Sequence, residues 1–292
     1  MRMRYVSKIQ ANLKRYQTIQ TMHHTAQVLD GSYKSIYKGR SMNFDELREY
    51  VPGDEIKDIE WKASARSQKM LVRQYIAEKK HNIMLVMDTN RRMLGDSEGN
   101  EEKRELAIMS AGTMAYFVNR SGDYVSATFA TENSIQHFPF KTGLANIELI
   151  LENYHKYVTM TNASDINAPL AYILRNFKRK MILLIVTDLS GIKAMTDQNI
   201  KRLLVAHDVL VLNISDADLD GCKAYDIENG DYLPDFFSQD KKLAKIAKEK
   251  KDALQKECME KLKSYGIPCS TVDYLDELEM EIIRLLEKHK MM

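Results

Sequence analysis

The sequence has little of several residue types that would mark a specialised class of protein. Only three cysteines occur in 292 residues, and they lack a Cys-x-x-Cys spacing. This usage argues against a disulfide framework and against a zinc site. The longest apolar run, at about residues 181–186, is far shorter than the roughly 20 residues of a membrane-spanning helix.

A strong charge of one sign is also lacking. The formal net charge is +2, whereas a nucleic-acid-binding protein is expected to carry a larger or more clustered basic excess. The lysines of residues 240–265 are interspersed with acidic residues, which predicts a solvated helix. The basic first residues precede no apolar signal core. We therefore expect a cytoplasmic protein with reduced thiols, and neither a nucleic acid nor a membrane span is predicted.

The sequence does contain alternating strand and helix patterns. Residues 82–88 and 181–188 are almost continuously apolar, which is typical of strands buried on both faces of a parallel sheet. Further strands are predicted at 71–77, 124–130, 134–138, 208–215 and 267–272, and helices at about 101–120, 144–157, 168–176, 197–206, 240–265 and 275–289. This alternation predicts an open, doubly wound, mostly parallel α/β sheet of the Rossmann type.

An extension is predicted before this sheet, over residues 1–78, with the sheet domain over 79–292. An apolar stripe predicts an amphipathic helix over 5–30. Asn43 is placed to cap a short helix through Tyr50, and Asp58 to cap another that reaches Arg66. Pro52 and Gly53 predict a turn between the two helices.

Residues 39–66, GRSMNFDELREYVPGDEIKDIEWKASAR, combine mixed charge with large apolar residues and the only tryptophan. Together with the following domain, they resemble the bacterial domain of unknown function 58 family. Its signature, Gly-Arg…Phe…Arg-Glu-Tyr-x-Pro-Gly-Asp…Trp…Ala-Arg, precedes a von Willebrand factor A-like domain, which residues 79–292 resemble. The resemblance implies a non-enzymatic protein that works beside MoxR-type AAA+ ATPases in the maturation or assembly of other proteins. The signature positions include Arg48, Glu49, Tyr50, Gly53, Asp54, Trp61 and Arg66.

Two aspartates mark a candidate site, because Asp88 and Asp188 end the two buried strands. Ligands of such sheets bind beyond the carboxyl ends of the strands, where the strand order reverses. With Thr142 they predict an oxygen-rich cluster suited to magnesium. The resemblance implies a metal pattern of Asp-x-Ser-x-Ser, Thr and Asp, in which Asn90 and Arg92 here replace the serines.

These replacements leave two interpretations open. A degenerate magnesium site would use Asp88, Asn90, Thr142 and Asp188, since asparagine still offers a carbonyl oxygen. Arginine has no acceptor. Arg92 could therefore stand in place of the metal as an ion-pair partner of either aspartate.

Two further choices concern function. Residues 39–66 could be a clasp that buries Phe44, Tyr50 and Trp61 against the sheet domain, or a surface that docks a partner. The clasp is the expected arrangement, because large aromatic side chains are usually packed. For the whole chain we expect a non-enzymatic interaction protein. The alternative is a magnesium-dependent phosphatase or phosphoryl-transfer enzyme that uses Asp88 and Asp188.

Overall fold

A six-stranded sheet forms the main body of the protein. The computed structural model describes residues 3–19, 46–51, 56, 59–74, 81–217, 225–226, 231–232 and 241–291. The strand order is β10-β7-β6-β3-β4-β5, and every neighbouring pair is parallel except β4 and β5. The predicted open, mostly parallel sheet is thereby confirmed. Its strands are β3 (Asn82–Met87), β4 (Tyr124–Ala130), β5 (Ile135–Lys141), β6 (Ile182–Thr187), β7 (Asp208–Ile214) and β10 (Cys269–Val272).

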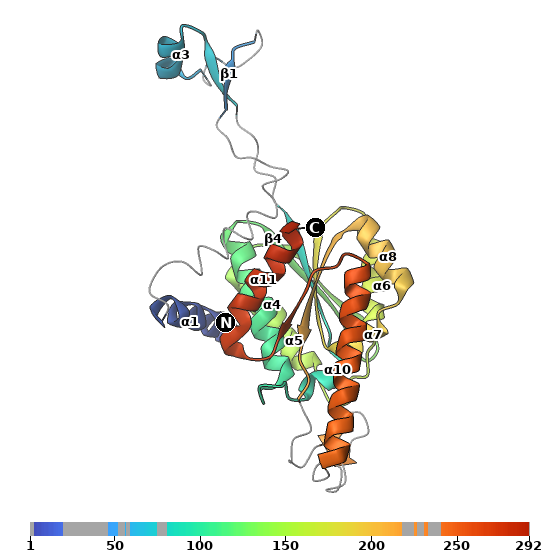
Figure 1. Ribbon diagram of the computed structural model, residues 1–292. Coiled ribbons are helices and arrows are strands. Elements are labelled where there is room, and N and C mark those ends of the chain that lie inside the picture. Colours follow the sequence, from blue (N-terminus) through green and yellow to red (C-terminus); the bar gives the residue numbers. More distant parts are fainter. Residues whose placement is uncertain are drawn as a thin grey trace.

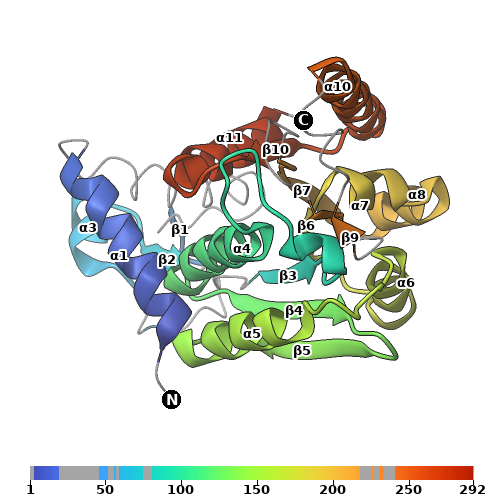
Figure 2. The ribbon, with the colours of Figure 1, turned by 90° about the horizontal axis from the view of Figure 1, so that it is seen from below.

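Two helical layers cover the sheet, as Figures 1 and 2 show. One layer contains α1 (Arg4–Ile19), α4 (Lys103–Arg120), α5 (Leu144–Tyr157) and α11 (Leu278–Met291). The other contains α6 (Asn167–Asn176), α7 (Leu189–Ala194), α8 (Asp197–Ala206) and α10 (Lys241–Ser264). Alternate residues of β3 face opposite layers: Ile83 and Leu85 face the first, Met84 and Val86 the second. This two-sided burial explains the continuous apolar runs in the sequence.

Helix α1 is part of the core of this domain. Its apolar stripe, which includes Tyr5 and Ile9, is buried beside α4 and α5. The buried carboxylate of Glu148 in α5 accepts hydrogen bonds from the first backbone N–H groups of α1, including those of Tyr5 at 2.9 Å and Val6 at 2.8 Å. These donors have no partner within their own helix. Residues 20–30, predicted to continue this helix, lie outside the described residues.

A second, much smaller body stands apart from the sheet in Figure 1. We call it the small unit; it comprises β1 (Glu46–Glu49), α3 (Trp61–Ser67) and β2 (Leu71–Gln74). β1 and β2 pair antiparallel, and Ile59 forms a bridge with Val72. The predicted short helix ending at Tyr50 is therefore wrong. Strand pairing satisfies the backbone there, whereas so short a helix would be marginal.

Several local features complete the description. Gly266 follows α10 with a φ of +66°, a left-handed conformation that glycine adopts readily at a helix end. β8 (Tyr225–Asp226) and β9 (Asp231–Tyr232) pair antiparallel. Two 3₁₀ turns, η2 (Arg91–Leu94) and η3 (Leu275–Glu277), were not predicted, nor was α7. Within the described part of the chain, no helix has both the length and the apolar character to cross a bilayer.

Candidate functional site

The strand order places Asp88 and Asp188 at one point of the sheet. β3 and β6 are parallel neighbours, and the chain builds outward from this pair in both directions. The pair is therefore the switch point at which such sheets bind ligands. Asp88 follows β3 and Asp188 follows β6, and their exposed fractions are 2% and 0%. The sequence correctly predicted that these carboxylates meet.

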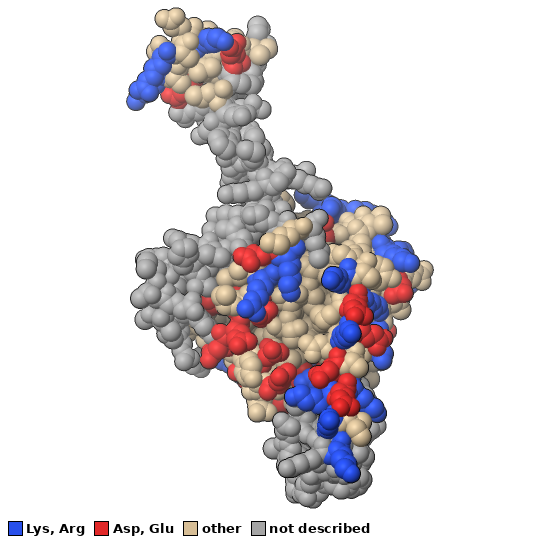
Figure 3. All heavy atoms as spheres, in the orientation of Figure 1, with Lys and Arg blue, Asp and Glu red and all other residues tan. Residues whose placement is uncertain are grey.

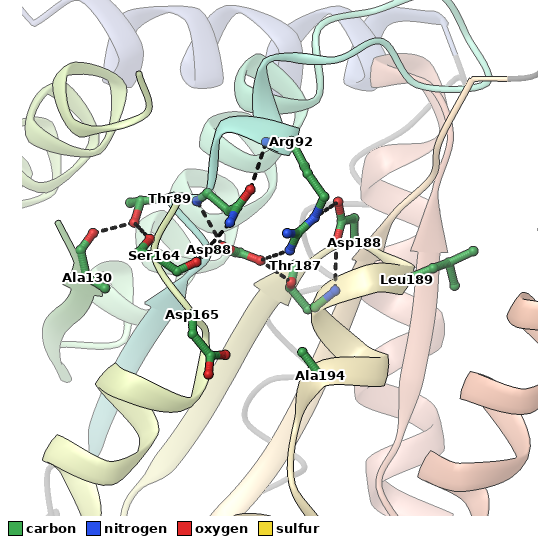
Figure 4. A network of polar contacts seen from close by, with 12 residues as sticks. Asp88, Thr89, Arg92, Ala130, Ser164, Asp165, Thr187, Asp188, Leu189 and Ala194 are labelled. Atoms are coloured by element: carbon green, nitrogen blue, oxygen red, sulfur yellow. Dashed lines mark hydrogen bonds and ion pairs between the residues drawn. The ribbon is translucent and has the colours of Figure 1, made fainter. Parts of the chain in front are cut away.

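Arg92 lies between the two aspartates (Figure 4). It belongs to η2, one turn after Asp88. Its Nε donates to Asp188 Oδ2 at 3.3 Å, and its Nη2 lies 3.6 Å from Asp88 Oδ2. Of the two interpretations from the sequence, this geometry matches the ion-pair interpretation of Arg92.

A second cation, Lys103, reaches the same carboxylate. Lys103 Nζ donates to Asp188 Oδ2 at 3.0 Å and also pairs with Asp216, which follows β7. The Lys103 side chain is only 3% exposed. Lys103 was not predicted from the sequence, although a signal was present. Lys103 is the first residue of α4, where the helix dipole disfavours a cation, so a specific anionic partner could have been inferred.

Close packing fixes the carboxylates. Thr187 Oγ1 donates to Asp88 Oδ2 at 2.7 Å, and Gly191 N donates to Asp188 Oδ1 at 2.8 Å. A Cβ at Gly191 would lie 1.9 Å from Thr187 Oγ1 and 2.8 Å from Asp88 Oδ2. Only glycine fits at this position, because any side chain would displace the carboxylate network.

The remaining polar groups of the edge bond to one another. The Asn90 side-chain oxygen accepts from the Arg92 N–H at 3.0 Å, while its Nδ2 donates to the Ser164 carbonyl at 2.9 Å. Thr89 donates to the Ala130 carbonyl and contacts Ser164 Oγ at 3.1 Å. The side-chain oxygen of Asn90, which was expected to bind a metal, therefore accepts a hydrogen bond from the neighbouring Arg92 backbone instead. Asp165, next to Ser164, points away from Arg92 in Figure 4.

Thr142 does not join the cluster. It is exposed and follows β5, whose last residue, Lys141, pairs with Val125 near the start of β4. This position is the opposite edge of the sheet from Asp88, because β5 runs antiparallel. Placing Thr142 beside the aspartates was wrong. Ser164, on the loop before α6, lies at the correct edge instead.

The two aspartates respond differently to burial. Desolvation, and then the neighbouring Asp188 charge, raise the pKa of Asp88. Desolvation also acts on Asp188, but Lys103 and Arg92 outweigh it and lower the pKa of that carboxyl. The Asp188 and Asp216 charges likewise outweigh burial to raise the pKa of Lys103. The ion pairs thus keep Asp188 ionised and Lys103 protonated.

This arrangement does not fit a resident magnesium ion. A dication prefers six or more oxygen ligands, but Asp188 Oδ2 already contacts two side-chain cations. Added positive charge would be repelled by both. Among the described residues, no cluster of three or more acidic, histidine or cysteine side chains suits a metal ion.

The small unit offers a different kind of surface. Trp61 is 64% exposed, so the prediction that it is buried in a clasp is wrong. Tyr50 is half-buried, and the Glu49 and Arg66 side chains are exposed. The backbone of Arg48 lies in β1, and Glu49 pairs with Lys69. Phe44, Gly53 and Asp54, the other predicted residues here, lie outside the described residues.

A family model described as "Protein of unknown function DUF58" matches residues 46–227, which is more than half of the chain. The chain belongs to this family. The predicted family resemblance is therefore confirmed. The DUF58 match joins the small unit to the sheet domain as far as the segment after β7.

The curated relatives share only limited sequence identity with this chain. An uncharacterized protein from Mycobacterium bovis is 26% identical over 195 residues, covering 65% of this chain and 60% of the relative. An uncharacterized protein from Mycobacterium tuberculosis matches with the same values. The DUF58 chain thus spans less than two thirds of these relatives.

Solved structures with similar chains include BatB from Bacteroides thetaiotaomicron, a conserved hypothetical protein. It has a TM-score of 0.48 and 14% identity, and the alignment covers 73% of this chain and 100% of that one. A von Willebrand factor type A protein from Catenulispora acidiphila gives a TM-score of 0.40 and 11% identity, covering 75% and 44%. The fold assignment of this DUF58 chain rests on its own strand order.

Proposed function

We propose that the chain is a non-enzymatic interaction protein that binds a protein partner through its small unit. The supporting observation is a group of large apolar side chains exposed on so short a segment. Their exposed fractions run from 42% to 69%. Scattered single apolar residues are normal on a surface, whereas a concentration of them marks an interaction site. The group consists of Leu47, Val51, Ile56, Trp61 and Met70.

The described residues of the small unit form little apolar core of their own. Of its apolar side chains with a described burial, only Ile59 and Val72 are buried, and its sheet has two strands. An isolated two-stranded sheet is at best marginally stable in water. A partner that covers Trp61 and its neighbours would supply the missing apolar contact.

A MoxR-type AAA+ ATPase is the partner that we propose. The support is the family signature at residues 39–66, whose described part lies on the small unit. The same small unit also carries the exposed charged side chains of Lys62, Arg66 and Glu49. This composition, an aromatic anchor accompanied by charged side chains, is common at protein interfaces. The free thiols Cys258 and Cys269 support a cytoplasmic location.

The exposed charge of the sheet domain supports a protein partner better than a nucleic acid. Figure 3 shows acidic and basic side chains mixed along α10 on the face in view. Lys245 and Glu249 form an i,i+4 pair there. Mixed charges of this kind do not build the basic stripe that phosphate backbones require.

Trp61 provides a direct test, because it is the only tryptophan. Purified chain is titrated with a MoxR-type ATPase from the same genome, and tryptophan emission is corrected for the ATPase's own signal. We expect a blue shift as Trp61 leaves water. In calorimetry, Trp61→Ala should weaken binding at least tenfold, in the range of interface hot spots. Val205→Ala on α8, where Val205 is 91% exposed, is the matched control.

Loss of affinity in both variants, or in neither, would count against the small unit as the docking surface. Absence of binding by the wild-type chain would count against the ATPase. The enzyme alternative has its own assay: magnesium-dependent turnover of a generic phosphoester that Asp88→Asn abolishes. We expect no turnover, since Asp88 is buried and its Oδ2 faces Thr187 and Arg92.

A further inference from the structure

We infer that Arg92 and Lys103 together replace the divalent cation at the switch point, so that the sheet domain is assembled and held without metal. The inference concerns the sheet edge alone and does not rest on the proposed partner. It extends the ion pair of Arg92 to a second, buried cation that comes from a different element of the fold.

The geometry gives each cation a separate task. Arg92 bridges the two strands, since it reaches Asp188 through Nε at 3.3 Å and Asp88 through Nη2 at 3.6 Å. Lys103 bridges β6 to the segment after β7 by pairing with both Asp188 and Asp216. A metal ion at this edge would serve the same purpose, because it would draw carboxylates from several strand ends to one point.

The charges are close to balanced. Asp88, Asp188 and Asp216 supply at most three negative charges, and Arg92 and Lys103 supply two positive ones. The cluster therefore carries a net charge of −1, or zero when Asp88 holds a proton. A dication added to this set would create an excess of positive charge in a buried place, which is strongly unfavourable.

Lys103 cannot easily make room for a metal. Its side chain is 3% exposed, and its two carboxylate partners hold its pKa above the ordinary value although burial acts in the opposite direction. Neutral lysine is thus disfavoured, and a charged lysine cannot leave without exposing Asp188 and Asp216 to each other. Lys251 of α10 donates to the Asp216 carbonyl at 2.6 Å, which further fixes this end of the cluster.

The inference predicts that metal dependence appears only when both cations are removed. Wild type and the double variant Arg92→Ala/Lys103→Ala are melted in EDTA and in millimolar Mg²⁺ or Mn²⁺. Bound Mn²⁺ is counted by electron paramagnetic resonance. Wild type should melt at the same temperature in all buffers and bind no Mn²⁺. The double variant should bind one Mn²⁺ and gain about 5 °C or more at saturation.

Two controls locate the effect. Lys180→Ala removes a lysine from an exposed pair with Asp208 and should behave as wild type. Adding Asp88→Asn to the double variant should abolish the Mn²⁺ gain. If the double variant does not fold in EDTA, it is refolded with and without Mn²⁺. We then expect the folded protein to be recovered only when Mn²⁺ is present.

Three results would overturn the inference. One is stoichiometric Mn²⁺ binding by the wild type. The second is a folded double variant that gains nothing from metal, and the third is failure of the double variant to refold in either buffer. Partner binding is not a readout of any arm, so these results remain separate from the test of the proposed function.

Discussion

The switch point and the small unit distribute polarity in opposite ways. At the switch point, Asp88, Asp188 and Lys103 are buried, with exposed fractions of 2%, 0% and 3%. On the small unit, Trp61 and Ile56 are exposed by 64% and 69%. Charged side chains are thus buried at the switch point, whereas large apolar side chains are exposed on the small unit.

The difference shows which region has its side chains satisfied by contacts within the chain. Each buried charge of the switch point has an opposite charge beside it, so the cluster needs nothing from outside. The small unit buries few of its apolar residues, so the hydrophobic effect favours covering it. The dense charge of the switch point is thus paired within the chain and acts as a structural lock. The surface that we propose for a partner is marked by exposed apolar side chains.

Lys103→Met should give the largest effect that tests this contrast. It leaves Asp188 and Asp216 without their shared cation, and removing one member of a buried pair costs about 3–5 kcal/mol. We expect this loss in the free energy of unfolding from denaturant titration. Lys180→Met is the control, because its pair with Asp208 is about half exposed and worth about 0–1 kcal/mol. Equal stability of the two variants would show that the cluster is not a lock.

Gly191→Ala should have the next largest effect. The new methyl group would meet Thr187 Oγ1 and Asp88 Oδ2, and overpacking of this kind costs about 1–3 kcal/mol. Ser190→Ala, one residue earlier on α7, serves as the control in the same unfolding assay. If Gly191→Ala matches that control, the carboxylates have more freedom than the geometry indicates.

Glu279 is a buried carboxyl whose pKa is shifted by burial alone, so it provides a comparison with Asp188. Burial raises its pKa from 4.5 to about 7, whereas cations lower the pKa of Asp188. Between about pH 4.5 and 7 the folded state keeps a proton on Glu279 that the unfolded chain has released. The free energy of unfolding therefore falls as pH rises through this window.

Glu279→Gln should remove this fall and stabilise the protein at pH 8 relative to wild type. We expect about 1–2 kcal/mol, since partial solvent screening reduces the effect of the shift. Chemical denaturation at pH 5 and pH 8 measures the difference. Glu287→Gln, at an exposed position on the same helix, is the matched control. A pH profile of Glu279→Gln that parallels wild type would contradict the assigned cause.

These contrasts also show what the sequence could predict. The runs at 82–88 and 181–188 predicted two buried strands, and hence the meeting of Asp88 and Asp188, because short continuous apolar runs are typical of strands covered on both faces. Thr142 was misplaced because apolar periodicity does not reveal that β5 runs antiparallel. The positive charge of Arg92 and its place four residues after Asp88 could be read from the sequence. Its distance to each aspartate could not, because that distance depends on the turn that η2 makes.

The small unit was predicted less well for a related reason. The general tendency of aromatic residues to be buried applies to an element that has a core to join. Among the described residues of this segment, only Ile59 and Val72 are buried apolar side chains, and single-chain patterns do not report what a partner would cover. The same short segment was predicted to begin with a helix, because local capping signals do not include the strand pairing of β1 with β2.

Trp61→Ala should have the smallest effect on stability. With 64% of Trp61 exposed, we expect a change within about 0.5 kcal/mol, the usual range for surface substitutions. Ile59→Ala is the matched comparison, because Ile59 is 6% exposed and bridges Val72. Hydrogen exchange of the β1 and β2 amides should speed up in Ile59→Ala and stay near wild type in Trp61→Ala. If Trp61→Ala loosens these amides as much, Trp61 is a packing residue, and the contrast between a complete sheet edge and an incomplete small unit fails.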